Sequence, residues 1–235
     1  IGDHDGNQMP ARSEQVRKAV SNRWSGDSIL GGTYCDIPQE WKENYYREWT
    51  NIINSLKNFQ CIVVWVPFNE AWGQFDTPAA VRLTRKLDPT RLINSASGGN
   101  FDFSEGAEGF GDILDVHHYP CPAMNVFERK FVNVLGEYGG IGLPVEGHTW
   151  NISNKWGYGG NKNDVEEVMA QYERFLEMLK VFVGTGCAAA VYTQTTDVEG
   201  EVNGLMTYDR KVIKMDMPRI AKGNQAVIKS MPAKR

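Results

Sequence analysis

The hydrophobic residues of the chain fall into short apolar runs bounded by turn residues, and longer stretches of mixed polarity lie between several of these runs. Short runs with apolar side chains on both faces are typical of strands buried in a parallel sheet. This pattern predicts strands at 61–67, 91–96, 113–117, 132–136 and 187–193.

The longer stretches carry apolar residues at steps of three and four, which is the spacing of one face of a helix. In the stretch 39–58 these positions are Trp41, Tyr45, Trp49, Ile52 and Leu56. Two further helices are predicted at 77–87, where Pro78 stands in the first turn, and at 163–183. Strands that alternate with helices indicate an α/β fold in which helices cover a parallel sheet.

No internal repeat, low-complexity tract or linker divides the chain, so residues 1–235 are interpreted as one domain. Residues 1–38 are assigned as a loop-rich segment leading into it, because Gly31 and Gly32 interrupt the one short apolar run there. Five strands do not close an eight-stranded barrel and would leave two sheet edges unpaired. We therefore expect the barrel to need strands from outside this chain.

The composition excludes several classes of partner. The formal net charge of -4 comes from dispersed residues without a basic tract, which argues against nucleic acid. No run of about 18 apolar residues is present, so no membrane partner is expected. Four cysteines stand far apart without zinc spacing and are interpreted as free thiols, Cys61 and Cys187 being buried. The compartment stays open, with a periplasmic or secreted location favoured over the cytoplasm.

The first candidate for chemistry is Glu70, which with Asn69 ends the apolar run 61–67 and its continuation Phe68. Aromatic residues flank it at Trp65, Phe68 and Trp72. A carboxyl group among such rings is partly desolvated, which raises its pKa toward the range that a general acid needs. The alternative interpretation is that Asn69 and Glu70 only cap the following helix.

The second candidate is Glu137, which follows the apolar run 132–136 and precedes Tyr138 and two glycines. The carboxyl ends of parallel barrel strands meet at one face, where such enzymes keep their active sites. Two carboxylates there suit glycosidic cleavage, in which one donates a proton to the leaving oxygen and the other attacks the anomeric carbon.

Three motifs, in this order, resemble the catalytic barrel of glycoside hydrolase family 2: Trp65 to Gly73, Leu87 to Leu92, and Gly136 to Gly140. The resemblance covers residues 39 to about 210. It implies a (β/α)8 TIM barrel of which this chain carries only the C-terminal portion, about strands four to eight. It further implies upstream barrel strands and accessory β domains as partners, and no cofactor.

The resemblance also implies roles for single residues. Glu70 takes the position of the acid/base and Glu137 that of the nucleophile. Asn69 is then expected to bind the sugar 2-hydroxyl, and Tyr119 to hydrogen-bond the nucleophile. Tyr192 lies near the position of the family's strand-eight aromatic residue, where a tryptophan is usual.

Further substrate contacts are assigned to side chains beside these motifs. The aromatic ring of Trp72, and that of Trp156 in the loop 143–163, are expected to contact the sugar or its aglycone, although lid packing is an alternative for the loop. His118 is assigned to the pocket beside Tyr119, with a packed structural role as the alternative. Adjacent histidines on a strand point to opposite faces, so His117 and His118 are not expected to share a metal ion.

The acidic run 197–201 could bind a hard cation, but a hydrogen-bonded loop is preferred, and no metal site is predicted. The resulting expectation is a retaining, β-galactosidase-like exo-β-glycosidase that acts on a glycoside or an oligo- or polysaccharide. Three alternatives stay open. They are a carbohydrate-binding barrel without catalysis, a metal-dependent hydrolase, and an inactive fragment of a larger glycosidase.

Overall fold

The computed structural model describes residues 38–69, 75–98, 111–124 and 126–231. The chain divides into two compact units. The first unit comprises residues 1–115 and 128–132, and the second unit comprises residues 116–127 and 133–235. Each unit has its own arrangement of helices and strands.

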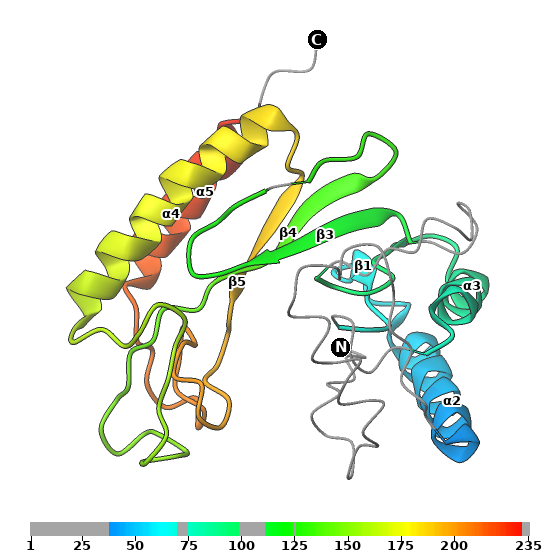
Figure 1. The fold of residues 1–235 in the computed structure, drawn as a ribbon, viewed down its shortest axis with the longest axis horizontal. Helices are drawn as coiled ribbons and strands as arrows, with labels where there is room; N and C mark the ends of the chain where they lie inside the picture. Colours follow the sequence, from blue (N-terminus) through cyan, green and yellow to red (C-terminus); the bar gives the residue numbers. More distant parts are fainter. Residues whose placement is uncertain (1–37, 70–74, 99–110, 125, 232–235) are drawn as a thin grey trace. The chain divides into compact units, whose positions relative to one another are not determined.

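In its described residues, the first unit combines two helices with two short parallel strands (Figure 1). In order, these are α2 (Gln39–Leu56), β1 (Val64–Trp65), α3 (Thr77–Leu87) and β2 (Leu92–Ile93). The strands β1 and β2 pair with Val64 opposite Leu92. An isolated parallel bridge between Asn69 and Ser97 continues this pairing beyond the carboxyl ends of both strands.

The core of the first unit forms under the apolar face of α2, where Tyr45, Trp49 and Ile53 are buried. The ring of Tyr45 stacks on Phe68 with centroids 5.1 Å apart. The Tyr45 hydroxyl donates to the carbonyl of Pro67 at 2.6 Å, which satisfies a polar group inside the core. The segment that leads out of β1 is therefore held against α2 by packing and by a hydrogen bond.

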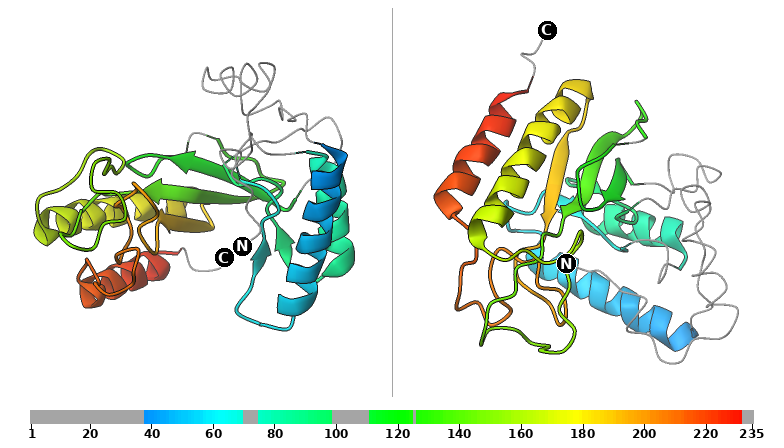
Figure 2. Two further views of the ribbon diagram at one scale, coloured as in Figure 1. Left: turned by 90° about the horizontal axis from the view of Figure 1, so that it is seen from below. Right: turned by 60° about the vertical axis from the view of Figure 1, so that its left-hand side comes forward.

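The second unit places two helices on one face of a sheet with strand order β3-β4-β5 (Figures 1 and 2). The strands are β3 (Ile113–His118), β4 (Val132–Gly139) and β5 (Ala189–Thr193), and β4 and β5 run parallel. The helices are α4 (Val165–Thr185) and α5 (Met217–Lys229). By residue number, β3 and β4 begin in the first unit and end in the second.

Helix α4 begins where Asp164 accepts a hydrogen bond from the backbone N–H of Glu167, and it ends at Gly186 with φ at 115°. Between these caps it buries a stripe of side chains against Leu135 and Tyr138 of β4. The stripe consists of Val168, Met169, Tyr172, Phe175, Leu176 and Leu179. Each large buried side chain contributes about 1.5–3 kcal/mol. This packing determines which face of β4 points away from the helices.

The predicted α/β class and the helices at 39–58, 77–87 and 163–183 are confirmed to within a few residues. The expected burial was wrong at Cys61, which is exposed, and in three of the predicted strands, where Val63, Leu92 and Val191 are 68%, 40% and 54% exposed. Cys187 is buried, as expected. None of the helices in the described ranges is both long and apolar enough to cross a bilayer.

Helix α5 was not predicted from the sequence. Only Ile220 is buried along it. A Cβ at Gly223 would lie 2.3 Å from a methyl carbon of Leu176, so this glycine allows α5 to approach α4 closely.

A glycine substitution at the end of β4 tests the close approach of β4 and β5. Gly139 has φ at +92°, and a Cβ there would lie 2.3 Å from the ring of Tyr192. We expect Gly139→Ala to lower the free energy of unfolding by about 2–4 kcal/mol through backbone strain and overpacking. Gly184→Ala is the matched control because open space surrounds that helical glycine, and it should stabilise by about 0.5–1 kcal/mol. Equal stability of the two variants in urea denaturation would contradict this.

Candidate active site

Glu137 lies in the second unit, near the carboxyl end of β4, at an irregularity in the pairing with β5. Leu135 is opposite Ala190, whereas Tyr138 is opposite Tyr192. The strand β4 therefore advances three residues while β5 advances two, so that one extra residue is accommodated at Gly136–Glu137. Such a bulge re-aims a side chain and is common beside active sites. The Glu137 side chain is 26% exposed, so its carboxylate reaches solvent.

The phenol of Tyr119 donates a hydrogen bond to Oε2 of Glu137. Its Oη also lies 2.7 Å from Oγ1 of Thr193, the last residue of β5. A phenol carries one proton and an ionised carboxylate can only accept, so the Tyr119 proton points to Glu137. The Thr193 hydroxyl then donates to Tyr119. These three side chains, from β4, β5 and the end of β3, form one hydrogen-bonded chain.

The protonation state of Tyr119 supports this direction. Burial raises the pKa of its phenol well above the usual value, and the negative charge of Glu137 raises that pKa further. Tyr119 therefore stays protonated throughout the neutral range and remains a donor to Glu137.

The two histidines of β3 contact different groups. His117 Nδ1 lies 3.3 Å from Oε2 of Glu137, and its side chain is only 7% exposed. His118 Nδ1 lies 2.7 Å from the carbonyl oxygen of Cys121 and donates to it, because a carbonyl only accepts. The structure thus brings His117 to Glu137, whereas His118 was the histidine predicted to lie in the pocket. The alternation of a strand separates the two side chains, but the sequence does not say which face is which.

The loop 143–163 brings aromatic rings to Tyr119. Tyr158 stacks on Tyr119 with centroids 3.6 Å apart, and Trp156 contacts Tyr158 edge to face at 5.3 Å. The Tyr158 N–H donates to the carbonyl of Gly140 at 2.8 Å. Gly140 has φ at +61°, and a Cβ there would lie 2.3 Å from the Tyr158 ring, so a glycine is required at this position. Trp156 is 38% exposed and therefore available to a ligand.

Tyr192 lies on the other side of β5 from the Thr193 contact. Its ring contacts Tyr138 and Tyr172 edge to face, at 5.7 and 5.2 Å, and its hydroxyl accepts from the N–H of Ile141. Burial raises the pKa of its phenol. Successive residues of a strand point to opposite faces, so Thr193 faces Tyr119 and Tyr192 faces the core under α4. The role in sugar binding that the resemblance implied for Tyr192 stays a prediction.

The other predicted site residues belong to the first unit. Glu70 and Trp72 lie outside the described residues. Asn69 is half-buried at its bridge with Ser97. In the same unit, the buried carboxylate of Asp115 in β3 accepts from Asn94 Nδ2 at 2.6 Å and from Ser97 Oγ at 2.8 Å. Asp115 does not stand at the end of an apolar run before an exposed turn. No pattern in the sequence therefore marked it as a candidate.

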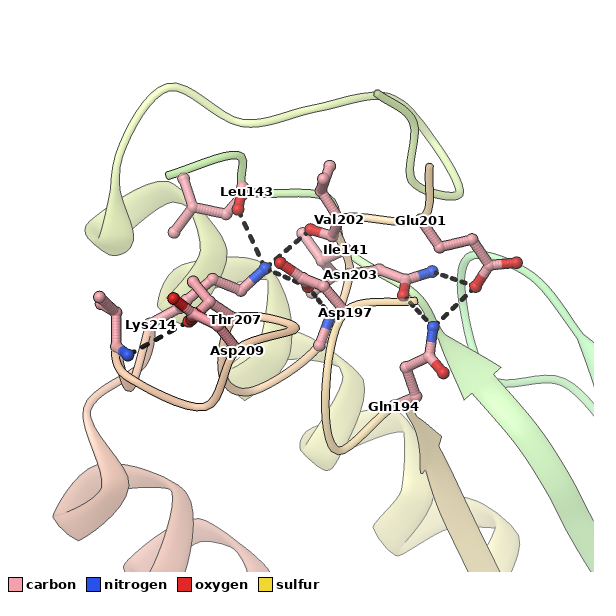
Figure 3. Close-up of polar contacts among 12 residues, drawn as sticks. Ile141, Leu143, Gln194, Asp197, Glu201, Val202, Asn203, Thr207, Asp209 and Lys214 are labelled. Atoms are coloured by element: carbon pink, nitrogen blue, oxygen red, sulfur yellow. Dashed lines mark hydrogen bonds and ion pairs between the residues drawn. The ribbon is translucent and has the colours of Figure 1, made fainter. Parts of the chain in front are cut away.

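The acidic run 197–201 forms a hydrogen-bonded loop (Figure 3). Lys214 Nζ donates to Asp197 Oδ1 at 2.6 Å and to the carbonyls of Leu143 and Val202 at 3.0 and 2.9 Å. Burial raises the pKa of Asp197 and lowers that of Lys214, while the hydrogen bond between them acts the other way. Among the residues that the structure describes, no group of three or more His, Cys, Asp or Glu side chains could hold a metal ion.

Comparison with known families bears on this geometry. Residues 24–136 match the model described as glycosyl hydrolases family 2, TIM barrel domain. This segment belongs to glycoside hydrolase family 2. The resemblance read from the three motifs is confirmed, and the matched segment contains Asn69, Glu70 and Tyr119 and ends one residue before Glu137.

A search of curated proteins found no match to this chain. Among solved structures it is similar to an FMN-binding β-glucuronidase from Facaelibacterium prausnitzii L2-6, with 17% sequence identity and a TM-score of 0.46. The match covers 85% of this chain but only 39% of that chain, so it extends over about two fifths of the length of that protein.

The buried ion pair yields a stability prediction. Lys214→Met leaves the carboxylate of Asp197 buried without its cation, which typically costs about 3–5 kcal/mol of unfolding free energy. The double variant Asp197→Asn with Lys214→Met removes both charges and keeps an acceptor for the N–H of Gly204, which lies 2.7 Å from Asp197 Oδ1. We expect the double variant to be more stable than Lys214→Met alone in urea denaturation. If the double variant loses as much unfolding free energy as Asp197→Asn and Lys214→Met lose in sum, the two residues are not coupled.

Proposed function

We propose that the protein of which this chain is part is a retaining β-glycosidase, with Glu137 as the nucleophile and Glu70 as the acid/base. The observation that carries the proposal is the carboxylate of Glu137, which is held by Tyr119 at a bulge near a strand end and is partly open to solvent. The family 2 segment that contains the Asn69-Glu70 motif supports the second role.

The contacts of Glu137 suit a nucleophile. The hydrogen bond from Tyr119 restricts the carboxylate to one rotamer, and this reduces the loss of freedom on attack. Because Tyr119 keeps its proton, its hydrogen bond lowers the negative charge density at Oε2 without neutralising the carboxylate. His117, 3.3 Å from the same oxygen, adds a second polar neighbour. Residues of three strands thus position the carboxylate of Glu137.

The proposed reaction is a double displacement. Glu137 attacks the anomeric carbon and forms a glycosyl-enzyme bond, while Glu70 gives its proton to the departing oxygen. Glu70 then takes a proton from water, and the resulting attack on the anomeric carbon releases Glu137 and a sugar of retained configuration. Asn69 is proposed to bind the 2-hydroxyl, and Trp72 and Trp156 to contact the sugar or aglycone.

The proposal includes barrel strands from outside this chain. The strand β5 lies at one end of the order β3-β4-β5, and its residues Ala189 to Val191 are exposed. An exposed strand edge presents unpaired backbone groups that another strand can bind. We propose that upstream strands of the complete enzyme pair there, that accessory β domains accompany them, and that the described strands correspond to about strands four to eight. The preference for galactosides also stays a prediction.

The catalytic role of Glu137 is tested in the complete protein on aryl β-glycosides. We expect Glu137→Gln to lower kcat by on the order of 10³-fold or more, because the amide cannot form the glycosyl-enzyme bond. Glu146→Gln is the matched control, since Glu146 is an exposed loop residue, and its kcat should be unchanged. Unchanged turnover in Glu137→Gln would refute the assignment. Sugar binding without turnover by the wild type would instead support a non-catalytic carbohydrate-binding barrel.

The hydroxyl of Thr193 yields a second prediction. Thr193→Val keeps the shape but removes the donor to Tyr119, so kcat should fall about 10-fold with KM nearly unchanged. Thr193→Ser keeps the hydroxyl and should retain most of the wild-type kcat. The two variants are compared by steady-state kinetics on one aryl glycoside. If Thr193→Val keeps the wild-type kcat while Thr193→Ser lowers it, Thr193 acts through its methyl packing and the hydrogen-bonded chain is not needed.

A further inference from the structure

The ring of Tyr158 lies almost face to face on the ring of Tyr119. The two rings are inclined by 8°, with centroids 3.6 Å apart. Aromatic pairs usually prefer an offset or an edge-to-face arrangement, such as the one that Trp156 and Tyr158 adopt at 5.3 Å. The attraction between the two tyrosine rings therefore does not by itself account for their stacking. The backbone of the loop 143–163 must impose it.

The backbone around Tyr158 is fixed to the segment that follows β4. The Tyr158 N–H donates to the carbonyl of Gly140 at 2.8 Å. Four residues further along the loop, the Lys162 N–H donates to the carbonyl of Gly142 at 2.7 Å. The part of the loop that carries Tyr158 thus pairs with the backbone directly after the strand end that holds Glu137.

A second pair of backbone hydrogen bonds fixes the same part of the loop to the segment after β5. The Trp156 N–H donates to the carbonyl of Gly200, and the Trp156 carbonyl accepts from the N–H of Val202, both at 2.9 Å. Residues 156 and 158 are therefore anchored to two different segments of the second unit. The place of the Tyr158 ring is set by these anchors and does not depend on Tyr119.

Close packing leaves Tyr119 little freedom on the side that this loop covers. Gly159 has φ at +75°, and a Cβ there would lie 3.0 Å from Cγ of Pro120, the residue after Tyr119. The torsion that turns a tyrosine ring about its axis is soft, so a flat neighbour is needed to fix the ring plane. Because resonance keeps the phenol O–H in that plane, the plane also sets the direction in which Tyr119 donates.

We propose that Tyr158 is a positioning residue of the glycosidase site: its ring fixes the plane of Tyr119 and thereby directs the phenol O–H to Glu137. Hydrogen bonds weaken steeply when donor and acceptor are misaligned, so the stacked ring preserves the contact that holds the nucleophile. Thr193 complements it, because its hydroxyl fixes the oxygen end of the same phenol at 2.7 Å. This inference rests on the proposed glycosidase function.

The test compares two replacements of Tyr158 in the complete protein, with one aryl β-glycoside as substrate. Tyr158→Phe keeps the flat ring, whereas Tyr158→Leu removes it. We expect kcat of the leucine variant to lie about 10-fold below that of the phenylalanine variant, with KM values within about threefold of each other, because the ring orients the nucleophile and does not bind the sugar. Equal kcat values of the two variants overturn the proposal.

A double-mutant cycle shows whether Tyr158 acts through Tyr119. In the Tyr119→Phe background the phenol O–H is absent, so its direction no longer matters. The ratio of kcat between Tyr158→Phe and Tyr158→Leu should then fall from about 10 to less than about 2. A ratio of about 10 in both backgrounds would mean that Tyr158 acts elsewhere, for example through Trp156, and would also overturn the proposal.

The pH profile gives a readout that a merely structural role would not move. Glu137 attacks only when it is ionised, and a carboxylate that loses a hydrogen bond is more easily protonated. The acidic limb of kcat/KM should therefore lie about 0.5–1 pH unit higher in Tyr158→Leu than in Tyr158→Phe. His117, 3.3 Å from the same carboxylate oxygen, is present in both variants, so its contribution cancels. Acidic limbs at the same pH contradict a role through Tyr119.

The matched control is Trp150→Leu, which removes another aromatic ring from the same loop. Trp150 is 67% exposed, and its ring contacts Tyr208 edge to face at 5.4 Å. This variant should keep the wild-type kcat and acidic limb. Urea denaturation checks that each variant folds. If Tyr158→Leu does not fold, Tyr158→Met takes its place with the same expected results, because the longer, flexible methionine fills more of the volume without a flat ring.

The outcomes separate this inference from the function on which it rests. If Glu137→Gln abolishes turnover while Tyr158→Leu and Tyr158→Phe have the same kcat, the glycosidase stands and the positioning role falls. If the wild type turns over no aryl β-glycoside, both fall.

Discussion

The hydrogen bond from Tyr119 to Glu137 is the interaction on which the geometry of the candidate site depends, because each neighbouring feature acts on one of its two ends. At the carboxylate end, the bulge in β4 turns Glu137 out of the regular strand pattern, and His117 approaches the same oxygen. At the phenol end, Thr193 donates to Tyr119, and the ring of Tyr158 lies flat on it. The burial that raises the pKa of Tyr119 also guarantees that it donates.

The loop 143–163 links this hydrogen bond to the more distant polar residues. It reaches Tyr119 through Tyr158 and the cluster of Gln194, Glu201 and Asn203 through Trp156. The buried contact of Lys214 with Asp197 and with the carbonyl of Leu143 fixes the start of this loop to the segment after β5. A structural ion pair therefore supports the loop whose Trp156 we propose to contact the sugar, although both of its charges are buried.

Much of the fold could be predicted from local patterns, and the site only in part. Runs such as 132–136 and the helical spacing in 39–58 depend on burial of one face, which the sequence shows directly. Val191 was expected to be buried, because nothing in the local sequence of a strand shows that its edge is exposed. Glu137 could be identified as a candidate from the sequence because it follows an apolar run.

The contacts around Glu137 depend on pairing between distant segments. Which face of a strand points to the site decides whether His117 or His118 lies beside Glu137. The same holds for Thr193 and Tyr192 beside Tyr119. Register decides this, and one residue of slip reverses it. The partnership of Gln194 with Glu201 and Asn203 arises from a loop that folds back on itself. Polar residues in such loops carry no periodic pattern, so their geometry requires the structure.

The central claim is that Glu137 forms a covalent bond to the sugar. It is tested most directly by incubating the complete protein with an activated 2-deoxy-2-fluoro β-glycoside, which slows release of the glycosyl enzyme, followed by mass spectrometry of the digested protein. If Glu137 is the nucleophile, we expect one added fluoroglycosyl group on the peptide that contains Glu137, and none in Glu137→Gln. A label on another carboxylate, or turnover of the reagent with inverted configuration and no label, would contradict it.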